Sequence, residues 1–208
     1  YQLVRIERFF ELEKALKGAS KGDSQKIASA LVKRLMPAVK AGNPDAAEVV
    51  KAKDGLFSAW YFAAPKDRRQ IENTLAKWIV HGPHGEGGDH PIQKILKAFG
   101  RRGANLVAAQ VPADHPNLYV YDKTTVVSRN CLLGYFWKSA GPSVRAETAR
   151  RYMKAVLKNK KLVEKKNGAV MLAIGALGKR QGVNFLLGLL QKDADVKVRA
   201  YAAVALRI

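Results

Sequence analysis

The sequence predicts an all-α fold in which pairs of helices stack into an armadillo-type α-solenoid. Apolar residues recur at intervals of three and four along most of the 208 positions, which is the spacing of one helix face. No run alternates apolar and polar residues over the length of a strand. The pair Ala176-Leu177 recurs 29 residues later as Ala205-Leu206, and Ala173 recurs as Ala202; such small side chains let a neighbouring helix approach closely. Because a helix pair of that size buries its apolar faces only by stacking on neighbours, we expect a right-handed superhelix of such pairs.

The stretch from Gly182 to Ile208 gives the clearest helix pair. Asp193 and Asp195 lie in the short turn between the two helices, where a carboxylate can accept hydrogen bonds from the free N–H groups of the second helix. Asp195 also precedes Arg199 by one turn, which favours an ion pair. The expected inward residues are Val183, Leu186, Leu187 and Leu190 in the first helix and Val198, Ala202, Ala205 and Leu206 in the second.

The same stretch carries the pattern D-x-D-x-x-V-R-x-x-A-A-x-A-L, in the form of Asp193, Asp195, Val198, Arg199, Ala202, Ala203, Ala205 and Leu206. It resembles the short HEAT repeat of the phycobilisome-lyase group over about residues 168–208. The resemblance implies a HEAT-like superhelix of helix pairs. It implies no single activity, because such repeats serve many functions.

Glycine, proline and capping residues mark the helix boundaries before residue 65. They predict a helix over 3–17 closed by Gly18, one from Asp23 or Ser24 that Pro37 kinks or splits, one starting at Asn43-Pro44, and a buried one over 55–64 ended by Pro65.

The next helix is amphipathic. We expect Asp67 to cap its start. Its predicted inward face holds Ile71, Leu75 and Trp78, and its predicted solvent face holds Arg68, Arg69, Glu72 and Lys77.

A loop rich in glycine and histidine interrupts the helices at 81–91 and divides the chain. We expect irregular helical repeats over 1–80 and basic HEAT-like repeats over 92–208. His81, His84 and His90 are weak metal-ligand candidates, with Glu86 or Asp89 beside them, but their spacing matches no zinc pattern. We therefore expect no metal site and no cofactor.

After the loop, a helix over 91–99 stops at Gly100, 104–110 continues the stack, and 111–123 is a second loop. Asp114-His115 is an acid and histidine pair, but neighbours on an extended segment point to opposite sides, so we expect no catalytic dyad. Cys131 belongs to a broad apolar face over 124–138 and is expected to be a core residue. Ser143 is expected to cap the helix that follows.

The net charge of +20 is concentrated in the second part of the chain. Residues 1–90 hold 15 basic and 11 acidic side chains, whereas residues 91–208 hold 22 and 6. Equivalent positions of a repeat array form a stripe, so these charges predict a basic partner-binding edge. Its candidate residues are Arg145, Arg150, Arg151, Lys154, Lys158, Lys160, Lys161, Lys165, Lys166, Lys179 and Arg180.

Two partners suit such an edge, an acidic protein surface or the phosphates of a nucleic acid. Trp60, Trp78 and Trp137 lie in apolar surroundings and are expected in the core, where they could not stack on bases. The favoured interpretation is therefore a non-enzymatic scaffold that binds an acidic protein, and nucleic-acid binding is the alternative. No apolar run is long enough to cross a membrane.

Enzymatic interpretations are weaker, because no phosphate-binding loop, dinucleotide fingerprint, metalloprotease motif or nucleophile elbow occurs. The chain is similar in fold class and charge to HEAT-fold glycosylases for alkylated DNA bases, but no acidic or aromatic site residue can be matched. Bilin lyases share the repeat type, again without a matching site residue.

The last helix, 196–208, ends in the apolar sequence AAVALRI. Terminal repeats of a solenoid carry a polar outer face. We therefore expect further repeats or a partner against Ala203, Val204 and Ile208.

Overall fold

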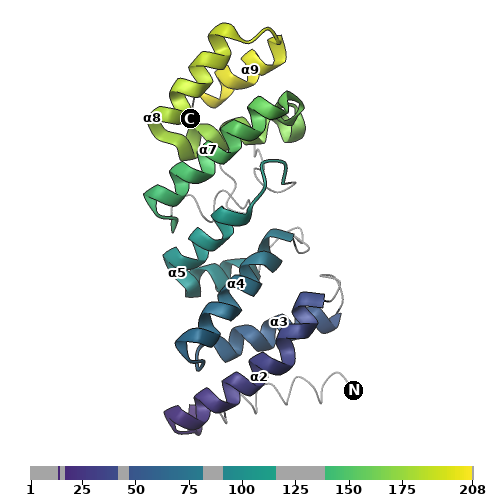
Figure 1. Ribbon diagram of the computed structural model, residues 1–208, viewed down its shortest axis with the longest axis vertical. Coiled ribbons are helices and arrows are strands. Elements are labelled where there is room, and N and C mark those ends of the chain that lie inside the picture. The colour runs from purple at the N-terminus through teal and green to yellow at the C-terminus, as the bar shows by residue number, and fades with distance from the viewer. Residues whose placement is uncertain (1–13, 15–16, 42–46, 82–90, 116–138, 208) are drawn as a thin grey trace. The chain divides into compact units, whose positions relative to one another are not determined.

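The computed structural model describes residues 14, 17–41, 47–81, 91–115 and 139–207. These residues form seven α-helices and two short 3-10 helices, with no strand among them, which confirms the all-α class (Figure 1). The chain divides into two compact units, residues 1–83 and 84–208, and each is described by itself. Most of the predicted 3–17 helix, the Asn43-Pro44 start and the 124–138 face with Cys131 and Trp137 lie outside the described residues.

Unit 1 contains α2 (Lys21–Ala41), α3 (Ala47–Trp60) and α4 (Pro65–His81). Helix α2 begins earlier than predicted, because Ser20 caps it. The Ser20 hydroxyl donates to the Asp23 carboxylate at 2.7 Å and accepts the Asp23 N–H at 3.2 Å. Pro37 lies within α2 and does not split it.

The predicted separate helix over 55–64 is wrong at both ends, because residues 55–60 belong to α3, which begins at Ala47. Helix α3 ends at Trp60, and the N–H groups of Phe62 and Ala63 both bond to the Ala59 carbonyl. Pro65 starts α4, where its missing N–H costs nothing, so Asp67 lies inside the first turn instead of capping it.

The three helices of unit 1 pack on one another around a shared apolar core. Ile71, Leu75 and Trp78 are buried on one face of α4, as predicted. Glu72 was placed on the solvent face, and this prediction is wrong because Glu72 is also buried. Its spacing to Leu75 and Ala76, three and four residues, puts it on the same helix face as the core.

Unit 2 contains α5 (Pro91–Gln110), α7 (Pro142–Lys158), the 3-10 helices η1 (Lys160–Val163) and η2 (Lys165–Gly168), α8 (Ala169–Lys192) and α9 (Val196–Ala205). Helix α7 contacts α5 and α8, and α8 contacts α9. Helix α7 starts at Pro142 without a side-chain cap, so the predicted capping by Ser143 is wrong. Instead, the Asn105 side chain accepts the Gly141 N–H at 2.8 Å.

Two helices of unit 2 share a break of the same backbone geometry. Gly100 interrupts α5 with φ 56° and ψ −141°, and Lys179 interrupts α8 with φ 46° and ψ −136°. The residues after each break also match, as Arg-Arg-Gly-Ala-Asn at 101–105 and Arg-Gln-Gly-Val-Asn at 180–184. Positive φ is uncommon for lysine, so the second break is imposed by the packing around it. We call the parts after the breaks the second segments of α5 (101–110) and α8 (180–192).

Helix α9 packs closely on the first part of α8, the helix to which the 29-residue recurrence relates it. A Cβ atom added to Gly175 would lie 2.9 Å from the Ala205 carbonyl oxygen. Gly168 likewise lies against the Tyr201 ring. Ala173 and Ala202, the recurring small residues, are both fully buried. The small side chains therefore let the two helices approach, as the sequence predicts.

Candidate functional site

Helix α7 separates a buried face from a basic one. Thr148, Ala149, Tyr152 and Val156 are buried. Arg150, Lys154 and Lys158 follow one another at intervals of four residues on the opposite side and are all exposed. Lys161 continues the exposed cations just after the helix. We call Lys154, Lys158 and Lys161 the α7 edge.

The predicted basic residues divide into two groups. Three of them pair with acids among the described residues, Arg150 with Glu147 at 3.1 Å, Lys160 with Asp193 at 2.7 Å and Lys165 with Asp114 at 3.4 Å. Arg145 is half-buried, and the side chain of Lys166 is not among those that the structure describes. Of the predicted basic residues that the structure describes, the exposed ones that form no ion pair are Lys154, Lys158, Lys161, Lys179 and Arg180.

Arg151 turns inward and caps the end of α5. Its guanidinium donates to the carbonyl oxygens of Ala108 at 2.7 Å and Val111 at 2.9 Å, and also to that of Ala109. A cation at this place satisfies carbonyl groups that have no partner within the helix. Arg151 therefore positions α7 on α5, and it does not belong to an exposed basic edge.

Tyr152 and Thr148 strengthen the same contact. The Tyr152 hydroxyl donates to the Val111 carbonyl at 3.1 Å, and the Thr148 hydroxyl lies 3.3 Å from the Ala108 carbonyl. Burial raises the pKa of the Tyr152 hydroxyl well above its ordinary value, because the phenolate would lose its hydration. The hydroxyl therefore remains a hydrogen-bond donor.

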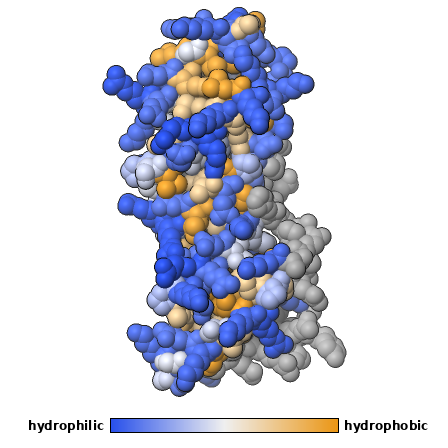
Figure 2. All heavy atoms as spheres, viewed as in Figure 1, coloured by the Kyte–Doolittle hydropathy of each residue, from blue (hydrophilic) through white to orange (hydrophobic). Residues whose placement is uncertain are grey.

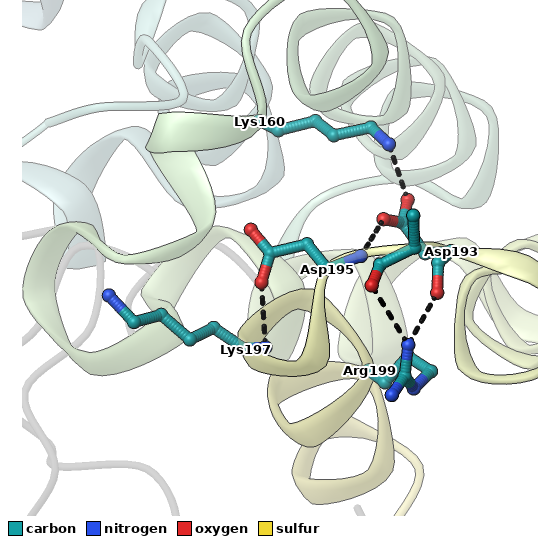
Figure 3. A network of polar contacts seen from close by, with 6 residues as sticks. Lys160, Asp193, Asp195, Lys197 and Arg199 are labelled. Carbon is teal, nitrogen blue, oxygen red and sulfur yellow. Dashed lines mark hydrogen bonds and ion pairs between the residues drawn. The ribbon is translucent and has the colours of Figure 1, made fainter.

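Asp193 is the centre of a polar network between α8 and α9 (Figure 3). Its carboxylate accepts Lys160 Nζ at 2.7 Å and the Asp195 N–H at 3.0 Å. The hydrogen bond from Lys160, followed by that from the Asp195 amide, lowers the pKa of Asp193 below its ordinary value of 3.8. The lysine-rich run at 158–166 is therefore partly a structural junction.

Asp195 caps α9, as predicted, by accepting the Lys197 N–H at 2.8 Å. The predicted ion pair between Asp195 and Arg199 is wrong. Arg199 donates to the carbonyl oxygens of Asp193 and Ala194 at 2.8 and 3.1 Å (Figure 3). Since the capping carboxylate is already engaged with the helix N-terminus, the guanidinium satisfies the turn carbonyls instead.

Unit 1 buries two charged groups that sequence reasoning missed. Lys53 is only 2% exposed, and its ammonium group lies 4.0 Å from the centre of the Trp78 ring and 3.5 Å from the Asp54 carboxylate. Glu72 accepts the Trp60 indole N–H at 3.0 Å. The spacing of Lys53 to Leu56 and Trp60, three and seven residues, is the signal that places it on the inward face.

The remaining candidates do not assemble into a site in the described part of the chain. Asp114 is half-exposed beside Lys165, whereas its neighbour His115 is buried. No group of three metal-binding side chains occurs among the residues that the structure describes. His84 and His90 lie outside those residues, and His81 is the last residue of α4.

Apolar residues are also exposed at the surface of unit 2. In the space-filling view, apolar side chains are visible at the end that holds α8 and α9, with hydrophilic side chains around them (Figure 2). Ala203 and Val204 on the outer side of α9 are exposed, and Ile208 lies outside the described residues. No described helix is both long and apolar enough to span a bilayer.

No family model matches the chain, and no curated protein or solved structure shows significant similarity to it.

Proposed function

We propose that the chain is a HEAT-like helical-repeat module with an interaction role and no catalytic one, and that its α7 edge binds an acidic protein surface. The observation that carries the proposal is the row of cations at one-turn spacing on the solvent side of α7. A row of this kind holds positive charge away from acids that would neutralise it, at a spacing that suits an acidic helix or strand.

The repeat architecture is supported by two relationships within unit 2. Helix α9 packs on the part of α8 to which the 29-residue recurrence relates it. The breaks at Gly100 and Lys179 share geometry and sequence. Both are expected if the chain adds helix pairs by one repeated step. A stacked array would carry the α7 edge on a rigid element, which favours recognition by a preorganised surface.

An acidic protein is preferred to a nucleic acid because the α7 edge consists of lysines, with no aromatic ring that could stack on a base, and the two described tryptophans belong to unit 1. Trp78 is buried against Lys53, and Trp60 is bonded to Glu72. Trp78 is too buried to stack on a base, and the Arg68 guanidinium lies 5.5 Å from the centre of the half-buried Trp60 ring. Charge alone would still attract phosphates, so nucleic acid is kept as an outcome of the test.

The α7 edge can be tested by reversing its charge in Lys154→Glu, Lys158→Glu and Lys161→Glu together. We expect affinity for a labelled 20-residue polyglutamate, measured by anisotropy in about 0.15 M salt, to fall about tenfold or more. Lys160 and Lys165 are left unchanged, because a glutamate at 160 would face the Asp193 carboxylate and a glutamate at 165 would face Asp114. Reversal of all four lysines of the 160–166 run would therefore confuse folding with binding.

The matched control reverses three exposed cations of α2, Lys33, Arg34 and Lys40, and changes the net charge equally. Equal losses in the two triple variants would show that only net charge matters and would overturn the proposed edge. A 20-base-pair random DNA is titrated in parallel over a salt series. If it binds more tightly than polyglutamate at about 0.15 M salt, with a steep salt dependence, the nucleic-acid function replaces the protein one.

A further inference from the structure

The second segments of α5 and α8 have equivalent faces, of which one is covered by another helix and the other is exposed to solvent. They follow breaks of the same geometry and share the Arg-x-Gly-x-Asn sequence. Their inward positions also agree, since Val107 and its counterpart Leu186 are both fully buried. Differences on their other faces therefore reflect what covers each segment.

Helix α7 covers the α5 segment in a specific way. Ala104 and Ala108, one turn apart, are 1% and 0% exposed. Between them, Asn105 accepts the main-chain N–H of Gly141 at the start of α7. At the far end, Arg151 and Tyr152 bind the last carbonyl groups. One helix thus supplies a free amide, a close-packed face and a cation in sequence.

The α8 segment carries the same positions uncovered. Val183 and Leu187, the counterparts of Ala104 and Ala108, are 40% and 38% exposed, so the prediction that both face inward is wrong. Asn184, the counterpart of Asn105, is exposed, and its side chain bonds to no other described residue. The face therefore keeps the asparagine that receives a helix start and replaces two alanines by larger apolar residues. Such a face favours burial, because each apolar side chain removed from water stabilises the contact.

We propose that the α8 face formed by Val183, Asn184 and Leu187 binds an α-helix of a partner protein that docks as α7 docks on α5. Its first main-chain N–H would bond to the Asn184 side-chain oxygen. A face of small or apolar residues would cover Val183 and Leu187, and an arginine three turns along would reach the carbonyl end of α8. The partner is therefore a helix with an arginine near its C-terminal end, in contrast to the acidic partner of the α7 edge.

The chain itself contains the probe for this face, because α7 already makes the equivalent contact. A peptide of residues 141–158, held helical by a hydrocarbon staple between positions 150 and 154 on its exposed side, is titrated into the full chain. We expect saturable 1:1 binding by calorimetry in about 0.3 M salt, where repulsion between the two basic molecules is screened. Circular dichroism first establishes that the peptide is helical, so absence of binding would overturn the proposal.

Three protein variants locate the binding. Leu187→Asp is expected to abolish it, since a carboxylate would be buried at the centre of the contact. Asn184→Ala is expected to weaken it about 3- to 10-fold, the usual range for one hydrogen bond. Leu157→Asp changes an exposed leucine of α7 and is expected to have no effect. Equal binding to Leu187→Asp and to the unchanged chain would mean that the peptide displaces α7 from α5, which would also overturn the proposal. The polyglutamate titration is independent of Leu187→Asp and Asn184→Ala, whose positions lie outside the α7 edge.

Discussion

The two units of the molecule differ in whether they bury a cation: unit 1 buries Lys53, whereas every described cation of unit 2 whose burial is known is at least partly exposed. In unit 1, the buried Lys53 lies over the Trp78 ring, and Glu72 accepts a hydrogen bond from the Trp60 indole. Unit 2 keeps its cations at the edges of helices, where Arg151 binds carbonyl groups and Lys160 binds Asp193. Buried charges need partners on every side, whereas edge charges need only part of their hydration replaced.

The net charge of the second part is higher mainly because it holds fewer acids, 6 against 11, while its cations, 22 against 15, largely follow its greater length. A helix end offers carbonyl groups with no partner inside the helix, so each end can hold one cation at little cost in hydration. Of the predicted basic residues, Lys154, Lys158 and Lys161 remain exposed on or just after α7, and Lys179 and Arg180 remain exposed at the break of α8. The following changes test this comparison, beginning with the largest expected effect.

Tyr152 joins α7 to α5 and is fully buried, so its loss should weaken the contact between these two helices. We expect Tyr152→Ala to lower the free energy of unfolding by about 3–5 kcal/mol, through the cavity and the lost hydrogen bond. Tyr152→Phe keeps the ring and should cost about 1 kcal/mol. Urea denaturation followed by circular dichroism measures both. Similar losses in the two variants would assign the stabilisation to the hydroxyl group, against the packing argument.

Arg151 and Arg150 are adjacent arginines with different roles. Arg151→Ala removes the cap of the α5 carbonyl groups and should cost about 1.5–3 kcal/mol of stability. Arg150→Ala removes only an exposed pair with Glu147 and should change stability by less than about 0.5 kcal/mol. The same denaturation experiment compares them. If Arg150→Ala lost more stability than Arg151→Ala, the carbonyl contacts of Arg151 would not stabilise the packing of α7 on α5.

Lys53 tests whether unit 1 needs its buried charge. Lys53→Met keeps the volume of the side chain and leaves Asp54 mostly exposed to water, so stability should change by no more than about 1 kcal/mol. Lys53→Ala leaves a cavity and should cost about 2–3 kcal/mol. Thermal unfolding of the pair distinguishes volume from charge. A large loss in the methionine variant would show that the contact with Trp78 stabilises unit 1 through its charge.

Asp193 gives the smallest effect, a dependence of stability on pH. Because the pKa of the folded carboxyl group lies below 3.8, its contribution is fully present above that value and is lost as pH falls through the folded pKa. We expect Asp193→Asn to lose less stability than the unchanged chain between about pH 5 and pH 2.5. Lys160→Met should raise the pKa of Asp193, measured by carboxyl NMR. An unchanged pKa would remove Lys160 as the cause.

The sequence anticipates those parts of the fold that depend on local spacing. The inward face of α4, the capping of α9 by Asp195 and the burial of Ala173 and Ala202 all follow from helical periodicity and from the hydrogen-bonding needs of helix starts. Charged residues on inward faces are the main exception. Lys53 and Glu72 lie at core spacing, but a burial argument based on residue type places them in solvent.

The roles of the predicted basic residues could not be read from the sequence either. The eleven cations proposed from composition and position are indistinguishable in the sequence, since each is a lysine or arginine in a helical or turn segment. Their separation depends on residues far along the chain. Arg151 meets carbonyl groups some forty positions earlier, and Lys160 meets a carboxylate of the α8–α9 turn.

The amino-acid sequence by itself therefore determined the helical class, the small-residue contact of α8 with α9 and the charge imbalance, because these depend on period, side-chain volume and composition. Tertiary structure alone decided which cations are engaged and which remain on the α7 edge, and it alone exposed the face of Val183, Asn184 and Leu187. The physical reason is that hydration and hydrogen bonding of a polar group depend on what packs against it, and that neighbour is chosen by the fold.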